Sequence, residues 1–190
     1  MDHYGKSGRI DLIIGSMFSG KSTELIRRIN RYKVLDKKIL VVKHKLDKRY
    51  SENSISTHSN MNLECISLDK LEEINTIQEY TRDYNECDVL VVEEAQFFED
   101  LYKFVTYSAD IKNKIVLVAG LDGDSNRKKF GEILDLVPEC ETITKLHALC
   151  VKCNDGTPAS FSKSLIKNDS QIYIGVSQYI AVCRYHFHTD

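Results

Sequence analysis

The chain has 190 residues, of which 42% are hydrophobic, and its 26 basic residues are balanced by 28 acidic ones, so its formal net charge is -2. That length allows one substantial core and a small satellite domain, while the balanced charge gives no support to non-specific nucleic-acid binding. No apolar run approaches the roughly 20 residues that span a bilayer, and the polar residues 1–6 lack a signal-peptide core. We therefore expect a cytoplasmic protein that acts on small molecules, with neither nucleic acid nor membrane as a partner.

The first predicted strand, residues 10–14, runs into the sequence GSMFSGKS at residues 15–22, which fits G-x-x-x-x-G-K-[ST] at every fixed position. An apolar pattern with helical spacing follows. In this order of strand, loop and helix, backbone N–H groups curl around phosphate oxygens, Lys21 reaches the outer phosphates and the Ser22 hydroxyl ligates Mg²⁺. The alternative, a glycine turn beside a chance lysine, fits the flanking pattern poorly. The sequence therefore predicts a nucleotide-binding loop.

The rest of the N-terminal part alternates between buried strands and helices. Further strands are predicted at 39–42, 89–92, 115–119 and 142–146, a long exposed polar loop at 43–62, and helices at about 69–84 and 101–105. Asp69 and Glu72 are candidates for a capping pair at the start of the first of these helices. Such alternation indicates a parallel sheet flanked by helices, with ligands at the carboxyl ends of its strands.

An acidic pair, Glu93 and Glu94, follows the predicted strand at 89–92. P-loop enzymes place an acidic residue near Mg²⁺ at this position, although two solvated glutamates at a loop start are the simpler alternative. A glutamate beside bound ATP can accept the proton of an attacking hydroxyl, and Gln96 and Phe97 can hydrogen-bond to and stack on a flat ring. The pattern favours phosphoryl transfer to an alcohol.

Two ligand pairs with x₂ spacing, Cys150 with Cys153 and Cys183 with His186, match a closed structural zinc site. His188 competes with His186 as the fourth ligand, and separate packing cysteines are the alternative to a metal. A catalytic zinc is disfavoured because protein ligands fill all four positions. The remaining cysteines are scattered singly, so we expect them to be reduced and to serve in packing: Cys65, Cys87 and Cys140.

The segment between the two pairs is suited to closing over a ligand. Residues 160–163 offer hydroxyls and a ring, and residues 172–176 read as a strand that enters a glycine-containing turn before Tyr179. Backbone amides of such a segment can hydrogen-bond to a planar base.

Taken together, these sequences resemble one family, the type II thymidine kinases of animal cytosol, many bacteria and large DNA viruses. The matching runs are GSMFSGKSTE at 15–24, DKRYS at 47–51, TH at 57–58, EEAQFF at 93–98, LDGDSNRKKFG at 121–131 and the two cysteine and histidine pairs. They cover nearly the whole chain in the family's order, which makes the set far more specific than any single motif.

The resemblance implies ATP- and Mg²⁺-dependent phosphorylation of the thymidine 5′-hydroxyl, with Glu94 as the catalytic base. Deoxyuridine and deoxycytidine stay open as alternative acceptors. It implies a P-loop ATP-binding α/β domain over 1–146 and a zinc-binding lasso domain over 147–190 that covers the nucleoside. It also implies a homotetramer that is inhibited by the triphosphate end product. The implied phosphate ligands are Gly15, Ser16, Met17, Phe18, Ser19, Gly20, Lys21, Ser22, Thr23 and Arg49, with Ser22, Asp47 and Glu93 near Mg²⁺. The implied nucleoside contacts are Met17, Gln96, Phe97, Leu121, Phe130, Ser162, Ile174, Gly175, Val176 and Tyr179.

Four positions depart from the family pattern. Glu93 replaces an aspartate, Ser125 an aromatic residue, Ala95 a glycine and Ser164 a basic residue of the lasso. Loss of an aromatic wall costs about 0.5 to 1.5 kcal/mol of ring contact or admits another nucleoside. The alternatives are therefore a kinase for another deoxynucleoside, or a non-catalytic P-loop module that senses nucleotides and contacts a partner through its zinc segment.

Overall fold

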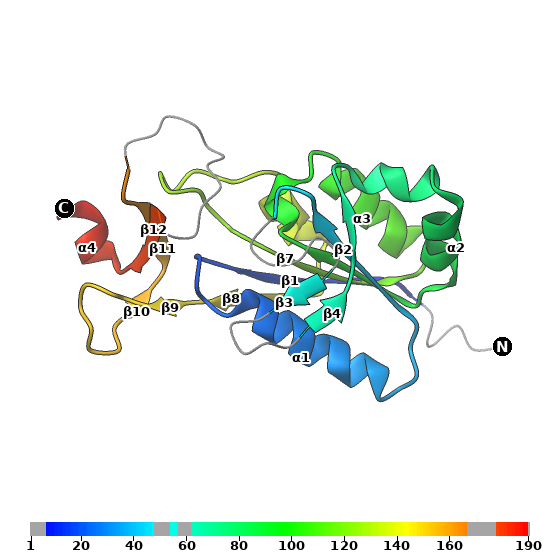
Figure 1. Cartoon of the computed structure of the whole chain (residues 1–190), viewed down its shortest axis with the longest axis horizontal. Helices are drawn as coiled ribbons and strands as arrows, with labels where there is room; N and C mark the ends of the chain where they lie inside the picture. Colours follow the sequence, from blue (N-terminus) through cyan, green and yellow to red (C-terminus); the bar gives the residue numbers. More distant parts are fainter. Residues whose placement is uncertain (1–6, 48–53, 57–61, 167–177, 190) are drawn as a thin grey trace.

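The computed structural model describes residues 7–47, 54–56, 62–166 and 178–189 (Figure 1). Its centre is a six-stranded sheet in the order β5, β2, β6, β7, β1, β8, and every neighbouring pair of strands is parallel. In chain order these strands are β1 (Arg9–Gly15), β2 (Ile39–His44), β5 (Ile66–Leu68), β6 (Val89–Glu93), β7 (Ile115–Gly120) and β8 (Thr142–Leu146). The predicted parallel α/β fold is confirmed, including the last strand that closes one edge of the sheet.

Helices cover both faces of the sheet, and the side chains of each strand alternate between two cores. In β6, Leu90 and Val92 pack on the side of α2 (Gln78–Glu86), α3 (Leu101–Asp110) and the 3₁₀ helix η3 (Ile133–Glu139). Val89 and Val91 face α1 (Lys21–Lys33) instead. Continuous apolar runs were the correct signal because each residue of a central strand is buried on one face or the other. No helix of the described part is both long and apolar enough to cross a membrane.

The single helix predicted over 69–84 is wrong, because the chain forms two shorter helices there. The 3₁₀ helix η1 (Leu71–Asn75) ends before Ile77, whose extended backbone precedes α2. Ile77 is 42% exposed, so it does not lie on the apolar face that the spacing assigned to it. Two consecutive β-branched residues, Thr76 and Ile77, disfavour the helical conformation at this point.

The predicted capping pair of Asp69 with Glu72 is also wrong. The Glu73 carboxylate accepts hydrogen bonds from the backbone N–H groups of Asp69 at 3.2 Å and Lys70 at 2.9 Å. The N–H of Glu72 donates to Asp100, a residue 28 positions further along the chain. A residue distant in the chain, Asp100, therefore accepts from the free N–H groups at the start of this helix, for which the sequence had suggested a nearby partner.

The long polar loop predicted over 43–62 is wrong at its start and in part of its middle. Lys43 and His44 complete β2 and are buried, and β3 (Ser54–Ser56) pairs with β4 (Asn62–Glu64) in an antiparallel ribbon. Lys43 lies opposite Glu93 in the register of β2 and β6. A lysine is tolerated inside the sheet here because carboxylates lie beside it.

The C-terminal residues form a small unit that follows β8 directly (Figure 1). Its elements are β9 (Ala148–Leu149), β10 (Pro158–Ala159), β11 (Phe161–Ser164), β12 (Tyr179–Val182) and α4 (Arg184–His188). β9 pairs with β10 and β11 with β12, and the unit has a separate hydrophobic cluster. The strand predicted at 172–176 lies outside the described residues.

The three isolated cysteines serve in packing, as predicted. Cys65 and Cys87 are buried, Cys140 is partly buried, and each is a free thiol. Burial raises the pKa of Cys65 to about 11. These thiols therefore stay protonated at neutral pH.

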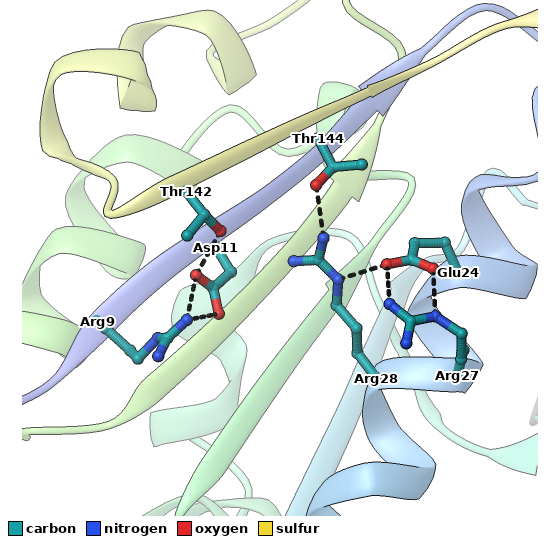
Figure 2. Close-up of polar contacts among 7 residues, drawn as sticks. All are labelled: Arg9, Asp11, Glu24, Arg27, Arg28, Thr142 and Thr144. Carbon is teal, nitrogen blue, oxygen red and sulfur yellow. Dashed lines mark hydrogen bonds and ion pairs between the residues drawn. The ribbon is translucent and has the colours of Figure 1, made fainter.

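Polar contacts hold the edge strand β8 to the neighbouring elements (Figure 2). Asp11, buried within β1, accepts hydrogen bonds from Arg9 at 2.7 Å and from the Thr142 hydroxyl at 2.6 Å. On α1, Arg28 joins Glu24 at 2.8 Å to Thr144 at 2.7 Å. Both threonines belong to β8, so hydrogen bonds connect this strand to β1 and to α1.

We expect Glu24→Gln to reduce the free energy of unfolding at pH 7 by about 1 kcal/mol. Hydrogen bonds and charge from Arg27 and Arg28 lower the pKa of Glu24 to about 2, from an ordinary value of 4.5. Because the folded-state pKa is depressed, this stabilisation is complete above pH 4.5 and is lost as the pH falls toward 2. Urea unfolding at pH 7 and pH 3 checks this, with the exposed Glu79→Gln as control. An equal loss of stability at both pH values would contradict the prediction.

Candidate active site

The loop between β1 and α1 has the backbone shape of a phosphate cradle. Gly15, Phe18 and Gly20 have positive φ angles of 152°, 63° and 84°, so the chain curls between strand and helix. The Lys21 ammonium crosses the loop and donates to the Ser16 carbonyl oxygen at 2.8 Å. The Ser19 hydroxyl is buried and has no hydrogen-bond partner among the residues that the structure describes. A curled loop with a free buried donor suits phosphate oxygens.

A short hydrogen bond joins this loop to the acidic end of β6. The Ser22 hydroxyl donates to the Glu93 carboxylate at 2.5 Å. Glu93 is the last residue of β6 and is 4% exposed. Two of the three residues assigned to Mg²⁺ therefore lie together. A hydroxyl and a carboxylate are oxygen ligands of the kind that Mg²⁺ prefers.

Glu94 has a strained backbone and a fixed carboxylate. Its φ of 51° and ψ of 41° are left-handed, an uncommon conformation for a residue with a side chain. The residue is buried, and its carboxylate accepts a hydrogen bond from the Gln96 side-chain amide at 2.5 Å. Such strain at a buried acidic residue is a feature of functional sites.

Gln96 also fixes the loop that follows β7. Its side-chain oxygen accepts a hydrogen bond from the Leu121 N–H at 2.9 Å, and it is 2% exposed. Phe97 stands edge-on to Phe130, with ring centroids 5.5 Å apart. The structure thus brings together four of the residues assigned to the nucleoside, on the carboxyl side of β6 and β7.

The C-terminal unit touches the phosphate loop directly. The Met17 N–H donates to the Ser162 hydroxyl at 2.9 Å, and the Ser16 hydroxyl donates to the Ala159 carbonyl oxygen at 3.0 Å. Ser162 is buried. Tyr179 begins β12 and lies opposite Ser164 of β11. A nucleoside wall from this unit would therefore stand beside the phosphate loop.

Asp47 is buried and follows the end of β2. The charges of Lys43, Glu93 and Asp47 all act on the Cys65 thiol, and the Lys43 ammonium donates to the Asp47 carbonyl oxygen at 3.4 Å. Thr23 is exposed in the first turn of α1. Four further assigned residues lie outside the described part: Arg49, Ile174, Gly175 and Val176.

Three departures from the family pattern can be placed in the structure. The φ of Ala95 is not positive, so its methyl group is accommodated and joins the core. Ser125 is half-buried in the loop after β7 and puts no ring there. The Ser164 hydroxyl donates to the Ile166 carbonyl oxygen at 2.7 Å.

Three contributors to the site were missed from the sequence. Ala159 acts through its carbonyl oxygen, which any residue has. Lys43 was assigned to an exposed loop, although its place after four apolar strand residues could have indicated burial. Arg127 contacts the C-terminal unit across 61 positions of sequence, which no local pattern reveals.

The predicted zinc ligands converge. Ligand atoms of Cys150, Cys153, Cys183 and His186 all lie within 4.8 Å of one another. His186 Nδ1 is 3.6, 3.3 and 3.4 Å from the three sulfurs, and the sulfurs of Cys153 and Cys183 are 3.8 Å apart. Around a tetrahedral zinc ion, bonds of about 2.3 Å to sulfur and 2.0 Å to nitrogen give separations of about 3.8 Å and 3.5 Å. The residues therefore fit zinc.

The rival ligand His188 has another partner. Its Nε2 lies 3.3 Å from the guanidinium of Arg127, and His188 is not part of the cluster. Geometry thus favours His186, the ligand in the tighter pair.

The local environment already favours a thiolate at one ligand. Burial opposes ionisation of Cys150, but hydrogen bonds from the surrounding backbone outweigh it and lower its pKa to about 6. Burial and the neighbouring sulfurs raise the pKa of Cys153 to about 11. Further thiolates in this cluster would repel one another, and a bound cation offsets that repulsion.

Comparison with known proteins gives a consistent picture. The family model described as thymidine kinase matches residues 8–187. Thymidine kinase 1 of Dictyostelium discoideum is 39% identical over 191 residues, covering 97% of this chain and 79% of that protein. Thymidine kinase a of Arabidopsis thaliana is 40% identical over 188 residues, covering 97% and 76%. The thymidine kinase of Yaba monkey tumor virus is 43% identical over 181 residues, covering 94% of each.

We expect the purified chain to carry about one zinc ion, and Cys150→Ser to lower the zinc content severalfold because a tetrahedral site loses one of four ligands. Elemental analysis by mass spectrometry after gel filtration measures both. Cys140→Ser is the matched control and should leave zinc unchanged. Active protein that holds no zinc would refute the site.

Proposed function

The chain belongs to the thymidine kinase family, and from that membership we propose that it transfers the γ-phosphoryl group of ATP to the 5′-hydroxyl of thymidine to give dTMP. Deoxyuridine is proposed as a weaker acceptor.

The observation that carries this proposal is the 2.5 Å bond between Ser22 and Glu93. It joins the phosphate loop to the acidic strand end, and the next residue along the chain is Glu94, which supports its proposed role as the base. Gln96 links that carboxylate to Leu121 and the aromatic pair. These contacts support the proposal that the loop, Glu94 and the residues around Phe97 act together.

In the proposed mechanism, Glu94 accepts the proton of the 5′-hydroxyl while the hydroxyl oxygen attacks the γ-phosphorus. The bond from that phosphorus to the bridging oxygen breaks, and ADP leaves with the electron pair. Lys21 and the loop amides hold the phosphates, and Arg49 steadies the transferring group. Positioning and charge stabilisation dominate such chemistry, so a rigid carboxylate and a preformed loop support it.

Mg²⁺ would be held near Ser22, Asp47 and Glu93, where it would neutralise phosphate charge. Zinc would be held by the four C-terminal ligands as a structural ion, since protein fills all four positions. The buried carboxylates and the ligand spacing described above support both assignments.

For the acceptor we propose that Phe97 and Phe130 flank the base, that Met17 faces its methyl group, and that Ser162 contacts its edge. Leu121, Ile174, Gly175, Val176 and Tyr179 would complete the pocket. The lack of an aromatic ring at Ser125 favours one alternative, in which another deoxynucleoside is accepted as well as or instead of thymidine.

We further propose a division into a P-loop domain over 1–146 and a lasso domain over 147–190, supported by the separate hydrophobic cluster of the second part. A cytoplasmic homotetramer is proposed from the family resemblance. The open edge of β8, where Ile143 is 44% exposed, offers one surface for contact between copies.

An assay of ADP release over a panel of nucleosides tests the function. Thymidine should stimulate release most, deoxyuridine less, and deoxycytidine and purine nucleosides least. A preference for deoxycytidine would assign the chain to another acceptor. No stimulation by any nucleoside, with intact ATP binding, would favour the non-catalytic sensing module.

We expect Glu94→Gln to lower kcat by about 10² to 10⁴-fold because the amide cannot take the hydroxyl proton. Lys21→Ala should have a comparable effect through lost phosphate contact. Steady-state kinetics with circular dichroism checks both, and the exposed pair Glu99→Gln and Lys33→Ala serve as controls. Near-normal turnover by folded Glu94→Gln would disprove its role as base.

A further inference from the structure

The loop after β7, residues 121–131, carries a rigid tip. The Asp124 carboxylate accepts hydrogen bonds from the N–H groups of Asn126 at 2.8 Å and Lys128 at 2.9 Å. Gly123 and Lys129 form an antiparallel bridge. Arg127, at the turn, has a left-handed φ of 60°. The loop is therefore a short, closed arm with Arg127 at its end.

Arg127 reaches the C-terminal unit at the zinc ligands. Its guanidinium carbon lies 4.6 Å from the ring centre of Phe187 and 5.6 Å from that of Phe161. One of its terminal nitrogens is 3.3 Å from His188 Nε2, and since arginine can only donate, this histidine accepts. Phe187 and His188 follow the ligand His186 directly in α4, so the arm rests on the helix that supplies the ligand.

The base of the same arm carries Leu121 and Phe130, two residues of the proposed nucleoside pocket, which we call the acceptor wall. Leu121 is hydrogen-bonded to Gln96, and Phe130 packs edge-on against Phe97. Gly131 has a φ of 59°, and a side chain at this position would collide with the Gln96 backbone. Both ends of the arm are therefore fixed against the segment that carries Glu94. Because the tip is rigid as well, a displacement of the tip would be transmitted to the base.

We propose that Arg127 is a positioning residue that couples the zinc-bound unit to the nucleoside pocket. Arg127 is not among the residues assigned to ATP or to the nucleoside, and its role rests on the proposed function. With α4 held by the metal, Arg127 is clamped between the phenylalanine rings and His188, and the arm holds Leu121 and Phe130 in place. With α4 loosened, the clamp is lost and the acceptor wall moves.

The test compares Arg127→Ala and Arg127→Lys with wild type, with Arg82→Ala on α2 as a control for loss of an exposed arginine. Arg127→Ala should raise the KM for thymidine about tenfold while kcat and the KM for ATP change less than about twofold. Lysine keeps the charge but not the planar stack, so Arg127→Lys should recover part of the loss.

A second measurement does not depend on activity. Zinc release to a chromogenic chelator should be several times faster from Arg127→Ala than from wild type or Arg82→Ala. In a Cys150→Ser background, Arg127→Ala should add little to the rise in thymidine KM, because both changes break the same connection.

An unchanged thymidine KM, a parallel loss in kcat and both KM values, or full additivity with Cys150→Ser would each overturn the coupling. If Arg127→Ala does not fold, the same comparison with Arg127→Lys decides the question. Absence of nucleoside phosphorylation in the wild type would refute the proposed function instead, and zinc release would still report on the clamp.

Discussion

The six strands of the sheet all point the same way, and the arrangement of the site depends on that constraint. Parallel strands bring their carboxyl ends to one edge, so the loop after β1, the acidic end of β6 and the arm after β7 meet without any special connection. Such a sheet has apolar side chains on both faces, and the helices bury both of them. The polar groups that gather at this edge are themselves buried, among them Glu93, Glu94 and Gln96.

Charge at that edge is arranged in complementary groups. Lys43 is buried in β2, and Glu93 ends the neighbouring strand β6. Asp47 is also buried and lies shortly after Lys43 in the chain. A single buried charge would destabilise the fold by several kcal/mol, but the cluster lets each member offset another.

Much of the fold was readable from the sequence. Each central strand is a continuous apolar run, and the phosphate loop and zinc ligands have fixed spacing, so local chemistry determines them. Local reasoning failed where tertiary contacts decide the outcome. Asp100 satisfies a helix terminus 28 residues away, Lys43 is buried by partners on another strand, and Ile77 is exposed by a break that the spacing does not show. The motifs predict which residues belong to the site. They do not predict the contacts among these residues, such as the hydrogen bond from Leu121 to Gln96.

The hydrogen bonds from Ser16 and Met17 to the C-terminal unit have a consequence for evolution and engineering. Two variable positions of an otherwise general nucleotide loop donate to Ala159 and Ser162, so the loop is fitted to one particular C-terminal segment. A chimera that grafted this segment onto another nucleotide-binding domain would leave the Ala159 carbonyl oxygen without its donor unless the serine at position 16 were transplanted with it, whereas the backbone N–H that reaches Ser162 is available from any residue except proline. Loop and segment are therefore matched at one side chain, Ser16, although 143 positions separate it from Ala159 in the chain.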